Sequence, residues 1–213
     1  MVAHVSDEDG LPIAARTARE LPVLLIAAGV IAFLVKTFVA QAFYIPSGSM
    51  IPQLQINDRV VVSKVSYHLH KPHRGDIVVF DAPKQAAFGP PVPKRNPLTK
   101  LLRKIGTGVG VIQPSTEEFI KRVIALPGET VDVKDGHVYV DGRQLEEPYL
   151  PKGMLTLPNG AKFPIKIQPG QLWVMGDNRG NSSDSRVFGP IQRKTVVGRT
   201  IAKVWPVPNM SFL

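Results

Sequence analysis

The sequence predicts a mainly β protein, in which an N-terminal transmembrane helix precedes an antiparallel β-sheet domain with a hairpin extension and a short amphipathic helix. Three observations support this fold class. An apolar run near the N-terminus has the length of a membrane span. Short β-branched segments alternate with glycine and proline turns over most of the remaining chain. A single compact helical pattern interrupts these segments.

The apolar run covers residues 21–43 and contains one charge, Lys36. It is about long enough to cross the hydrocarbon core of a bilayer as a helix. The nearby arginines lie only on its N-terminal side, and positively charged flanks tend to stay in the cytoplasm. We therefore predict a single-pass protein of the cell membrane, with residues 1–20 as a cytoplasmic tail and residues 44–213 as an extracytoplasmic domain.

A cleavable signal peptide is the alternative explanation of this run. Ala40-Gln41-Ala42 is an A-x-A cleavage signature just beyond the apolar residues. However, the run is long for the apolar region of a signal peptide, and Lys36 separates it from the alanines. These two features favour a retained anchor.

The strand pattern begins at Arg59 with RVVVSKV and continues with GDIVVFDAP, both β-branched runs bounded by charge, glycine or proline. FIKRVIALPGETVDVKDGHVYVDGRQL predicts a strand, a Pro-Gly turn and a hairpin that closes at Asp135-Gly136, a strong two-residue turn signal. QLWVMGDN and VVGRTIAKVWP add two strands. Strands at this spacing indicate an antiparallel β domain.

Residues 84–118 interrupt the strands with a basic insertion rich in proline and glycine. Within it, NPLTKLLRKIG predicts a short helix with Asn96 as N-cap, Pro97 at the first helical position and Gly106 as the stop. Its apolar residues recur at i, i+3, i+4 and i+7, with basic residues off that face. Such a helix could lie on a membrane surface or pack on the β domain, and the sequence favours neither.

Composition excludes several kinds of chemistry. The chain has no cysteine, so disulfides, thiolate metal ligands and a cysteine nucleophile are ruled out. The net charge is +9, and the basic excess lies after residue 42, where 23 basic residues face 13 acidic ones. Such an excess suits an anionic surface, and the apolar segment favours lipid headgroups over nucleic acid. We expect a lipid bilayer as a partner and no nucleic acid.

Two serines follow the apolar run, in the segment YIPSGSMIP. A serine hydroxyl is a weak nucleophile until a base takes its proton, so a base must come from elsewhere in the chain. His68, His70 and His73 cluster in HLHKPH. A metal site would need further ligands on rigid structure, so we interpret this cluster as a solvated connector and expect no metal or cofactor.

Lys121 is the other candidate base, because strand alternation in FIKRVIALPG places it on one face with Phe119 and Val123. Burial among apolar neighbours would lower its pKa and leave a neutral amine that can accept a proton. An ordinary edge-strand lysine is the alternative, and this stretch alone favours it. The segment MGDNRGNSSDSR predicts a loop rich in side-chain-to-backbone hydrogen bonds, which alone indicates a cation-binding loop or a turn.

Four segments taken together resemble the boxes of bacterial type I signal peptidase: IPSGSMIPQL, RGDIVVF, FIKRVIALPGE and GDNRGNSSDSR, in this order after an N-terminal apolar segment. The resemblance covers nearly all of residues 37–206 and is closest to the single-span Gram-positive type. It implies a membrane-bound serine endopeptidase without a cofactor. The substrates would be secreted preproteins, whose N-terminal signal peptides it removes.

The resemblance implies that Ser49 is the nucleophile and Lys121 the general base. Ser47 would donate its hydroxyl to the oxyanion beside the Ser49 backbone N–H. Five residues would support this dyad, by positioning the amine or by forming ion pairs that hold the loop against the catalytic strand: Ser182 for the amine, Asp184 with Arg186, and Asp177 with Arg122.

The resemblance also implies substrates with small residues, usually alanine, at positions −1 and −3. An extended substrate would lie as an added strand between the strand before Ser49 and the strand around Lys121, so that alternate side chains face the enzyme. Five side chains would form the shallow apolar pockets: Phe43, Ile45, Met50, Leu54 and Ile120. Core packing is the alternative role for all five. The family often has tyrosine where Phe119 stands, and a polar residue where Gly180 stands.

Two other functions fit parts of the sequence. One is a Ser-Lys protease that cuts itself, as repressor-type switch proteins do, although the apolar segment argues against it. The other is a membrane-anchored basic module that binds acidic polymers or lipids. That module would lose no function when Ser49 or Lys121 is replaced.

Overall fold

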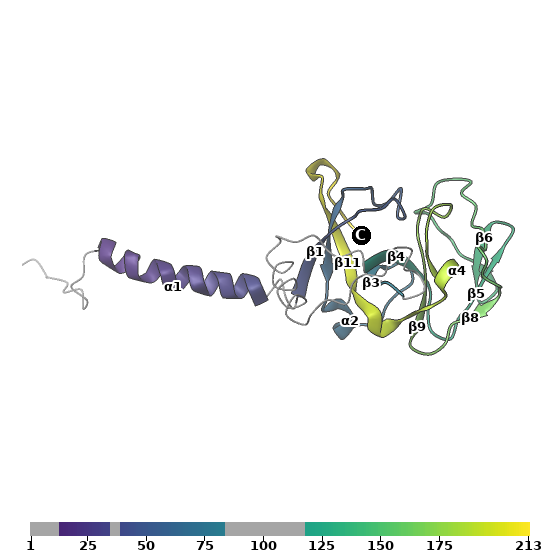
Figure 1. Ribbon diagram of the computed structural model, residues 1–213, viewed down its shortest axis with the longest axis horizontal. Coiled ribbons are helices and arrows are strands. Elements are labelled where there is room, and N and C mark those ends of the chain that lie inside the picture. Colours follow the sequence, from purple (N-terminus) through teal and green to yellow (C-terminus); the bar gives the residue numbers. More distant parts are fainter. Residues whose placement is uncertain (1–12, 35–38, 84–117) are drawn as a thin grey trace, which may run out of the picture.

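The computed structural model describes residues 13–34, 39–83 and 118–213. Helix α1, Ile13–Leu34, projects from one end of a β-rich body, and the small sheet of the hairpin extension lies at the opposite end (Figure 1). The predicted amphipathic helix and nearly all of the basic insertion fall outside the described residues.

The observed N-terminal helix differs from the predicted segment 21–43. It begins earlier, at Ile13, and ends at Leu34, while Ala40–Tyr44 forms strand β1 and pairs with β2. An apolar run fits a buried strand as well as a helix, and as a strand it buries Phe43 in the core and leaves Ala42 exposed. Across the described ranges, no helix combines the length and apolarity that crossing a membrane requires.

One large antiparallel sheet forms most of the body. Its strand order is β1-β2-β11-β3-β4-β9-β10, with β12 also paired to β11. Its strands are β1, β2 (Arg59–Ser63), β3 (Ile77–Asp81), β4 (Glu118–Ala125), β9 (Gln171–Met175), β10 (Ile191–Gln192), β11 (Val196–Trp205) and β12 (Ser211–Phe212). This confirms the predicted mainly β, antiparallel class.

The hairpin extension is a second, four-stranded antiparallel sheet with the order β7-β6-β5-β8. Its strands are β5 (Thr130–Lys134), β6 (His137–Val140), β7 (Arg143–Gln144) and β8 (Ile165–Lys166). The predicted turn is confirmed, because Asp135 and Gly136 join β5 to β6 with φ of 50° and 78°. These left-handed values match the two-residue turn that suits twisted strands.

Short helices complete the described chain and were not predicted. They are α2 (Ser66–Leu69), α4 (Ser185–Phe188), η3 (Arg193–Thr195) and η4 (Val207–Asn209). Single turns carry too little periodicity to stand out in a sequence. His70 and His73 lie in the connector between α2 and β3, as predicted, whereas His68, the third histidine of the predicted connector, is part of α2.

One buried apolar cluster joins strands β1, β2 and β4. Phe43 of β1, Val60 and Val62 of β2, and Ile120 of β4 belong to one buried cluster. A second cluster joins Trp173 of β9 to apolar residues of the extension. The extension is therefore packed on the large sheet, which fixes its position relative to β4 and β9.

Candidate active site

The Ser47-Gly48-Ser49 turn follows β1 and is fixed by backbone hydrogen bonds on both sides. Ile45 N–H donates to Asp58 O at 2.9 Å, and Leu54 N–H donates to Met50 O at 2.9 Å. Ser49 is 8% exposed, whereas Ser47 is an exposed residue. The turn therefore holds one hydroxyl inside the protein and one at its surface.

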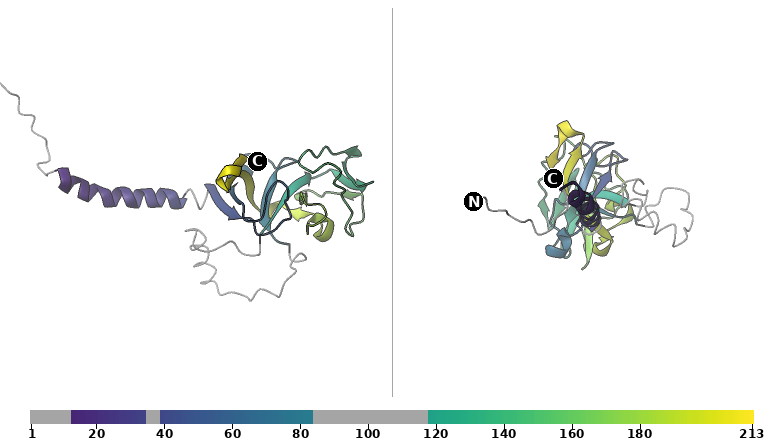
Figure 2. Two further views of the ribbon diagram at one scale, coloured as in Figure 1. Left: turned by 90° about the horizontal axis from the view of Figure 1, so that it is seen from above. Right: turned by 90° about the vertical axis from the view of Figure 1, so that its left-hand side faces the viewer.

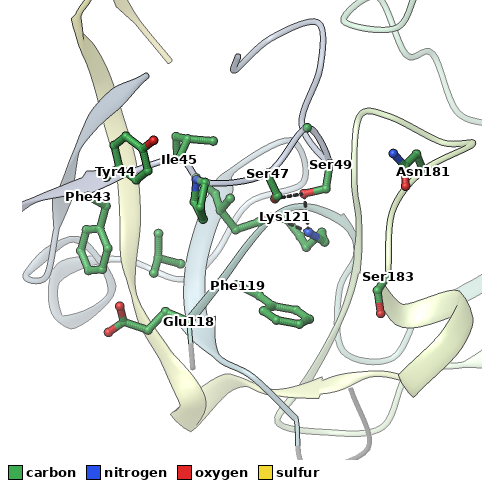
Figure 3. Close-up of a pocket in the computed structure, with 14 residues that line it drawn as sticks. Phe43, Tyr44, Ile45, Ser47, Ser49, Glu118, Phe119, Lys121, Asn181 and Ser183 are labelled. Atoms are coloured by element: carbon green, nitrogen blue, oxygen red, sulfur yellow. Dashed lines mark hydrogen bonds between the residues drawn. The ribbon is translucent and has the colours of Figure 1, made fainter. Parts of the chain in front are cut away.

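Lys121 reaches Ser49 from β4, although 72 positions separate the two residues in the sequence. The Lys121 Nζ lies 2.7 Å from the Ser49 Oγ and 2.9 Å from the backbone oxygen of Ile120. Figure 3 shows the amine and the hydroxyl pointing toward one another beside a groove. This distance is short enough for direct proton transfer.

Burial governs the charge of the lysine. Lys121 is 4% exposed, and loss of solvent lowers the pKa of its amine to about 8, although the carboxylates of Asp184 and Asp177 pull that pKa upward. Residues 118–121 of β4 pair only with β3, but Lys121 is buried against Ser49, so the alternative of an ordinary solvated edge-strand lysine is wrong. A substantial fraction of the amine is neutral near pH 8.

Asn178 holds the serine turn from the opposite loop, residues 175–186. Its backbone N–H donates to Ser49 O, and its Nδ2 donates to Gly48 O, each at 3.0 Å. Sequence analysis did not single out this residue, because an asparagine in a polar loop is equally typical of a turn. The bond to Gly48 O fixes the peptide group that contains the Ser49 N–H, and the bond to Ser49 O fixes the peptide group that follows it.

Two buried ion pairs frame this loop. Arg122 donates to both carboxylate oxygens of Asp177, from Nε at 2.8 Å and from NH2 at 2.6 Å. Arg186 makes a similar two-bond contact with Asp184, at 2.9 and 2.8 Å. Burial opposes the charge of Asp184, but the Arg186 contacts and the Gly176 N–H outweigh it and lower the pKa of this carboxyl.

The other two predicted polar groups lie close to the dyad. The Ser47 Oγ is 3.5 Å from the Ser49 Oγ. The Ser182 Oγ is buried, and no partner within the described part of the chain meets hydrogen-bond geometry with it. It packs against the backbone at Gly176, where an added methyl group would also strike the Ser49 carbonyl.

An open groove of about 480 Å³ runs past the dyad. Of the five predicted pocket residues, Phe43, Ile45 and Ile120 line it, together with Ser47, Ser49 and Lys121. Met50 and Leu54 have no exposed surface and belong to the core cluster behind the groove. A substrate could not touch these two side chains without displacing core residues, so their prediction as pocket residues is corrected to core packing.

Sequence analysis missed a buried arginine, Arg179, and its partner Glu147. The Arg179 guanidinium donates to Glu147 through NH1 at 3.0 Å and also through NH2. The arginine stood inside the quoted box, but a carboxylate 32 residues away gives no local signal. Across the described residues, no three His, Asp or Glu side chains gather into a set that could hold a metal ion.

Comparisons with known proteins identify the family of this chain. The family described as "Signal peptidase, peptidase S26" matches residues 18–205. The chain belongs to this family. It is 40% identical to a probable signal peptidase I-2 of Synechocystis over 91% of this chain and 76% of the relative. It is 41% identical to a signal peptidase I of Leptolyngbya laminosa, over 86% of this chain and 78% of that one.

A signal peptidase I of Mycobacterium tuberculosis is 35% identical over 89% of this chain and 73% of its own length. Membership in the S26 family makes this chain a serine endopeptidase of the type I signal peptidase class, which removes signal peptides. The self-cleaving and binding-module alternatives are therefore set aside.

Gly176→Ala should lower the rate of signal-peptide cleavage by about 100-fold, because the new methyl group would clash with the Ser49 carbonyl and Ser182 and shift the turn. The assay compares cleavage of one preprotein by the variant and the unaltered enzyme. Gly180→Ala is the matched control, since nothing lies within 4 Å of a methyl group there. Equal rates for Gly176→Ala and the unaltered enzyme would show that the close contact of Gly176 with the Ser49 carbonyl does not hold the serine turn in place.

Proposed function

We propose that this signal peptidase cuts preproteins with Ser49 as the nucleophile and Lys121 as the general base. The observation that carries the proposal is the 2.7 Å contact between the Lys121 amine and the Ser49 hydroxyl inside a buried site. Burial keeps part of the amine neutral, and only a neutral amine can accept a proton. The chain needs no cofactor for this chemistry.

In the first half of the reaction, the Ser49 Oγ attacks the carbonyl carbon of the scissile peptide while its proton passes to the Lys121 Nζ. The oxyanion that forms accepts hydrogen bonds from the Ser49 N–H and the Ser47 hydroxyl. Each such donor contributes roughly 3 kcal/mol in comparable sites. The intermediate then collapses, the C–N bond breaks, and the ammonium of Lys121 protonates the leaving amine.

In the second half, the acyl group is an ester on Ser49. A water molecule gives one proton to the neutral Lys121 amine and attacks the ester carbon. Collapse of this second intermediate releases the signal peptide as a carboxylic acid, and the Ser49 oxygen takes the proton back. Ser182 lies close to the dyad, and we assign it the role of limiting the positions that the amine can take.

We also propose that the groove binds the substrate as an extended strand and selects small residues at −1 and −3. Residues 122–125 of β4 pair with β9, whereas residues 118–121 pair with β3 and border the groove on their other side. That side offers backbone groups to an added strand. Alternate substrate side chains would face the groove between Phe43, Ile45 and Ile120, where large residues would not fit.

We further propose that α1 holds the enzyme at a lipid bilayer. Its apolar side chains are mostly exposed, with Leu24 at 63% and Ile26 at 67%. The β11–β12 hairpin, which also exposes Val207 and Phe212, lies at the same end of the body as α1 (Figure 2, left). Exposed apolar surface of this kind is typical of a membrane contact. The orientation, with the N-terminus in the cytoplasm, remains a prediction from charge.

Ser49→Ala and Lys121→Arg should both abolish cleavage of a preprotein in detergent. Arginine stays protonated at every accessible pH, so it cannot serve as a base. Mass analysis of the products from the unaltered enzyme should place the cut after a small residue. A Lys121→Arg variant that still cuts would reject the lysine base, and a Ser49→Ala variant that still cuts would reject the nucleophile.

Activity should rise with pH through about 8, because deprotonation of Lys121 produces the competent form. Below that value, kcat/KM should fall about tenfold per pH unit as the ammonium accumulates, and above it the rate should level off. The profile is measured with one peptide substrate from pH 6 to 10, with circular dichroism at each pH to show that the fold persists. A flat profile between pH 6 and 9 is incompatible with this assignment.

Full-length enzyme should float with phospholipid vesicles, and Leu24→Asp with Ile26→Asp should release most of it. Burying one large aliphatic side chain contributes about 1.5–3 kcal/mol, and a carboxylate in lipid costs at least as much. Ala28→Ser on the same helix is the control. Flotation that survives the double substitution would show that α1 does not make the lipid contact.

A further inference from the structure

Residues 145–157 form a loop of the extension, called the strap below. The strap lies against the loop that carries Asn178. Its Glu147 accepts hydrogen bonds from NH1 of Arg179 at 3.0 Å and from NH2 of the same guanidinium. The Arg179 side chain has no exposed surface, and that of Glu147 is 11% exposed. The two form a buried ion pair between the strap and residues 175–186.

Arg179 joins the strap to the turn beside the nucleophile. Its Nε donates to Gly176 O at 3.1 Å, and its NH1 donates to the Thr156 Oγ1 of the strap at 2.6 Å. The preceding residue, Asn178, makes the two bonds that hold Gly48 and Ser49. One short chain of contacts therefore leads from Glu147 to the peptide group of the nucleophile.

Tyr149 of the strap makes a second connection, on the side of the base. The Arg122 Cζ lies 3.9 Å from the centre of the Tyr149 ring, which is cation–π geometry. The Tyr149 hydroxyl donates to the Glu147 Oε1 at 2.7 Å. Arg122 follows Lys121 on β4 and pairs with Asp177, so the ring packs on the guanidinium that anchors this part of the catalytic strand.

Neither Glu147 nor Tyr149 reaches the substrate groove. The groove is lined by residues of β1, the serine turn, β3, β4 and the 181–183 segment, and Glu147 and Tyr149 are absent from its described lining. A residue that contacts neither the reacting atoms nor the groove acts on the reaction only through the groups that it holds. Glu147 holds Arg179, which follows the Asn178 that binds the Ser49 turn. Tyr149 packs on Arg122, which follows Lys121.

We propose that Glu147 and Tyr149 are positioning residues, and that the strap fixes the separation of the Ser49 hydroxyl and the Lys121 amine by holding Arg179 and Arg122. The proposal rests on the dyad proposed above. Removing Glu147 leaves a buried guanidinium without its carboxylate, which is costly enough to move the turn at residues 176–179. Small displacements of reacting groups reduce turnover strongly.

The first test compares Glu147→Gln with Glu146→Gln, which changes the exposed neighbouring carboxylate of the same loop. Glutamine keeps the shape of Glu147 but lacks the charge that compensates Arg179. We expect kcat to fall by about 10- to 100-fold for Glu147→Gln, with KM changed by less than about threefold, because the groove is untouched. Glu146→Gln should match the unaltered enzyme in both constants.

The second test compares Tyr149→Leu with Tyr149→Phe. Phenylalanine keeps the ring over Arg122, whereas leucine removes it, so kcat should fall by about tenfold for leucine and recover most of the loss for phenylalanine. Hydrogen exchange should quicken in the leucine variant at residues 47–51 and 176–179 but not in the β5–β6 hairpin. Exchange that quickens everywhere would reveal a general loss of stability and overturn the positioning role.

Unchanged kcat in both Glu147→Gln and Tyr149→Leu would overturn the proposal, as would a rise in KM that accounts for the whole loss. If Glu147→Gln does not fold, the tyrosine pair alone decides the outcome. The dyad is judged separately, by Ser49→Ala and Lys121→Arg. Failure of the strap proposal would therefore leave the proposed function standing.

Discussion

The site depends on keeping one amine partly uncharged while it touches a hydroxyl. Burial of Lys121 removes the solvent that would stabilise an ammonium, and this lowers its pKa. Buried carboxylates nearby work in the opposite direction, and the loop contains two, Asp177 and Asp184. Each carboxylate is paired with its own arginine, and the positive charge of that arginine offsets much of the effect of the carboxylate on the pKa of Lys121. The two ion pairs therefore permit a polar, hydrogen-bonded loop next to the desolvated Lys121 amine.

The same constraint explains why three distant segments meet here. The serine turn follows β1, and the lysine lies on β4. The loop after β9 binds the serine turn through Asn178 and binds Arg122, the neighbour of Lys121, through Asp177. In the large sheet β4 and β9 are neighbours, while β1 lies at the far end of the strand order. The two hydrogen bonds from Asn178 to Gly48 and Ser49 nevertheless join the turn after β1 to the loop after β9. Ser49 is thus placed by the loop as much as by the strand that precedes its turn.

Much of the fold could be predicted because strands and their turns leave local patterns. β-branched runs bounded by glycine and proline identified β2, β3, β4, β9 and β11, and the hairpin at Asp135 was found from two residues. The apolar pattern alone missed β1, because such a run fits a membrane helix and a buried strand equally well, and only the family resemblance implied a strand before Ser49. The short helices and two-residue strands were missed because each covers only about one period of its pattern, too little for a repeat to be seen.

The site was predictable to a different degree. Lys121 was ambiguous from its strand alone, since desolvation depends on what the fold packs around it, and the family resemblance resolved the choice. Met50 and Leu54 were placed in the pocket although they are core residues, because apolar side chains on either side of a strand or turn look alike in sequence. Arg179 and Glu147 were missed because their pairing joins two loops that only the tertiary structure brings together.

The concentration of guanidinium–carboxylate pairs in one dry region also bears on where such an enzyme can work. Arg122, Arg179 and Arg186 are all buried with their partners, out of reach of mobile counterions. Dissolved salt weakens attraction between exposed charges, whereas pairs enclosed by protein are screened far less. The architecture around Ser49 and Lys121 is thereby insulated from the ionic composition of its surroundings.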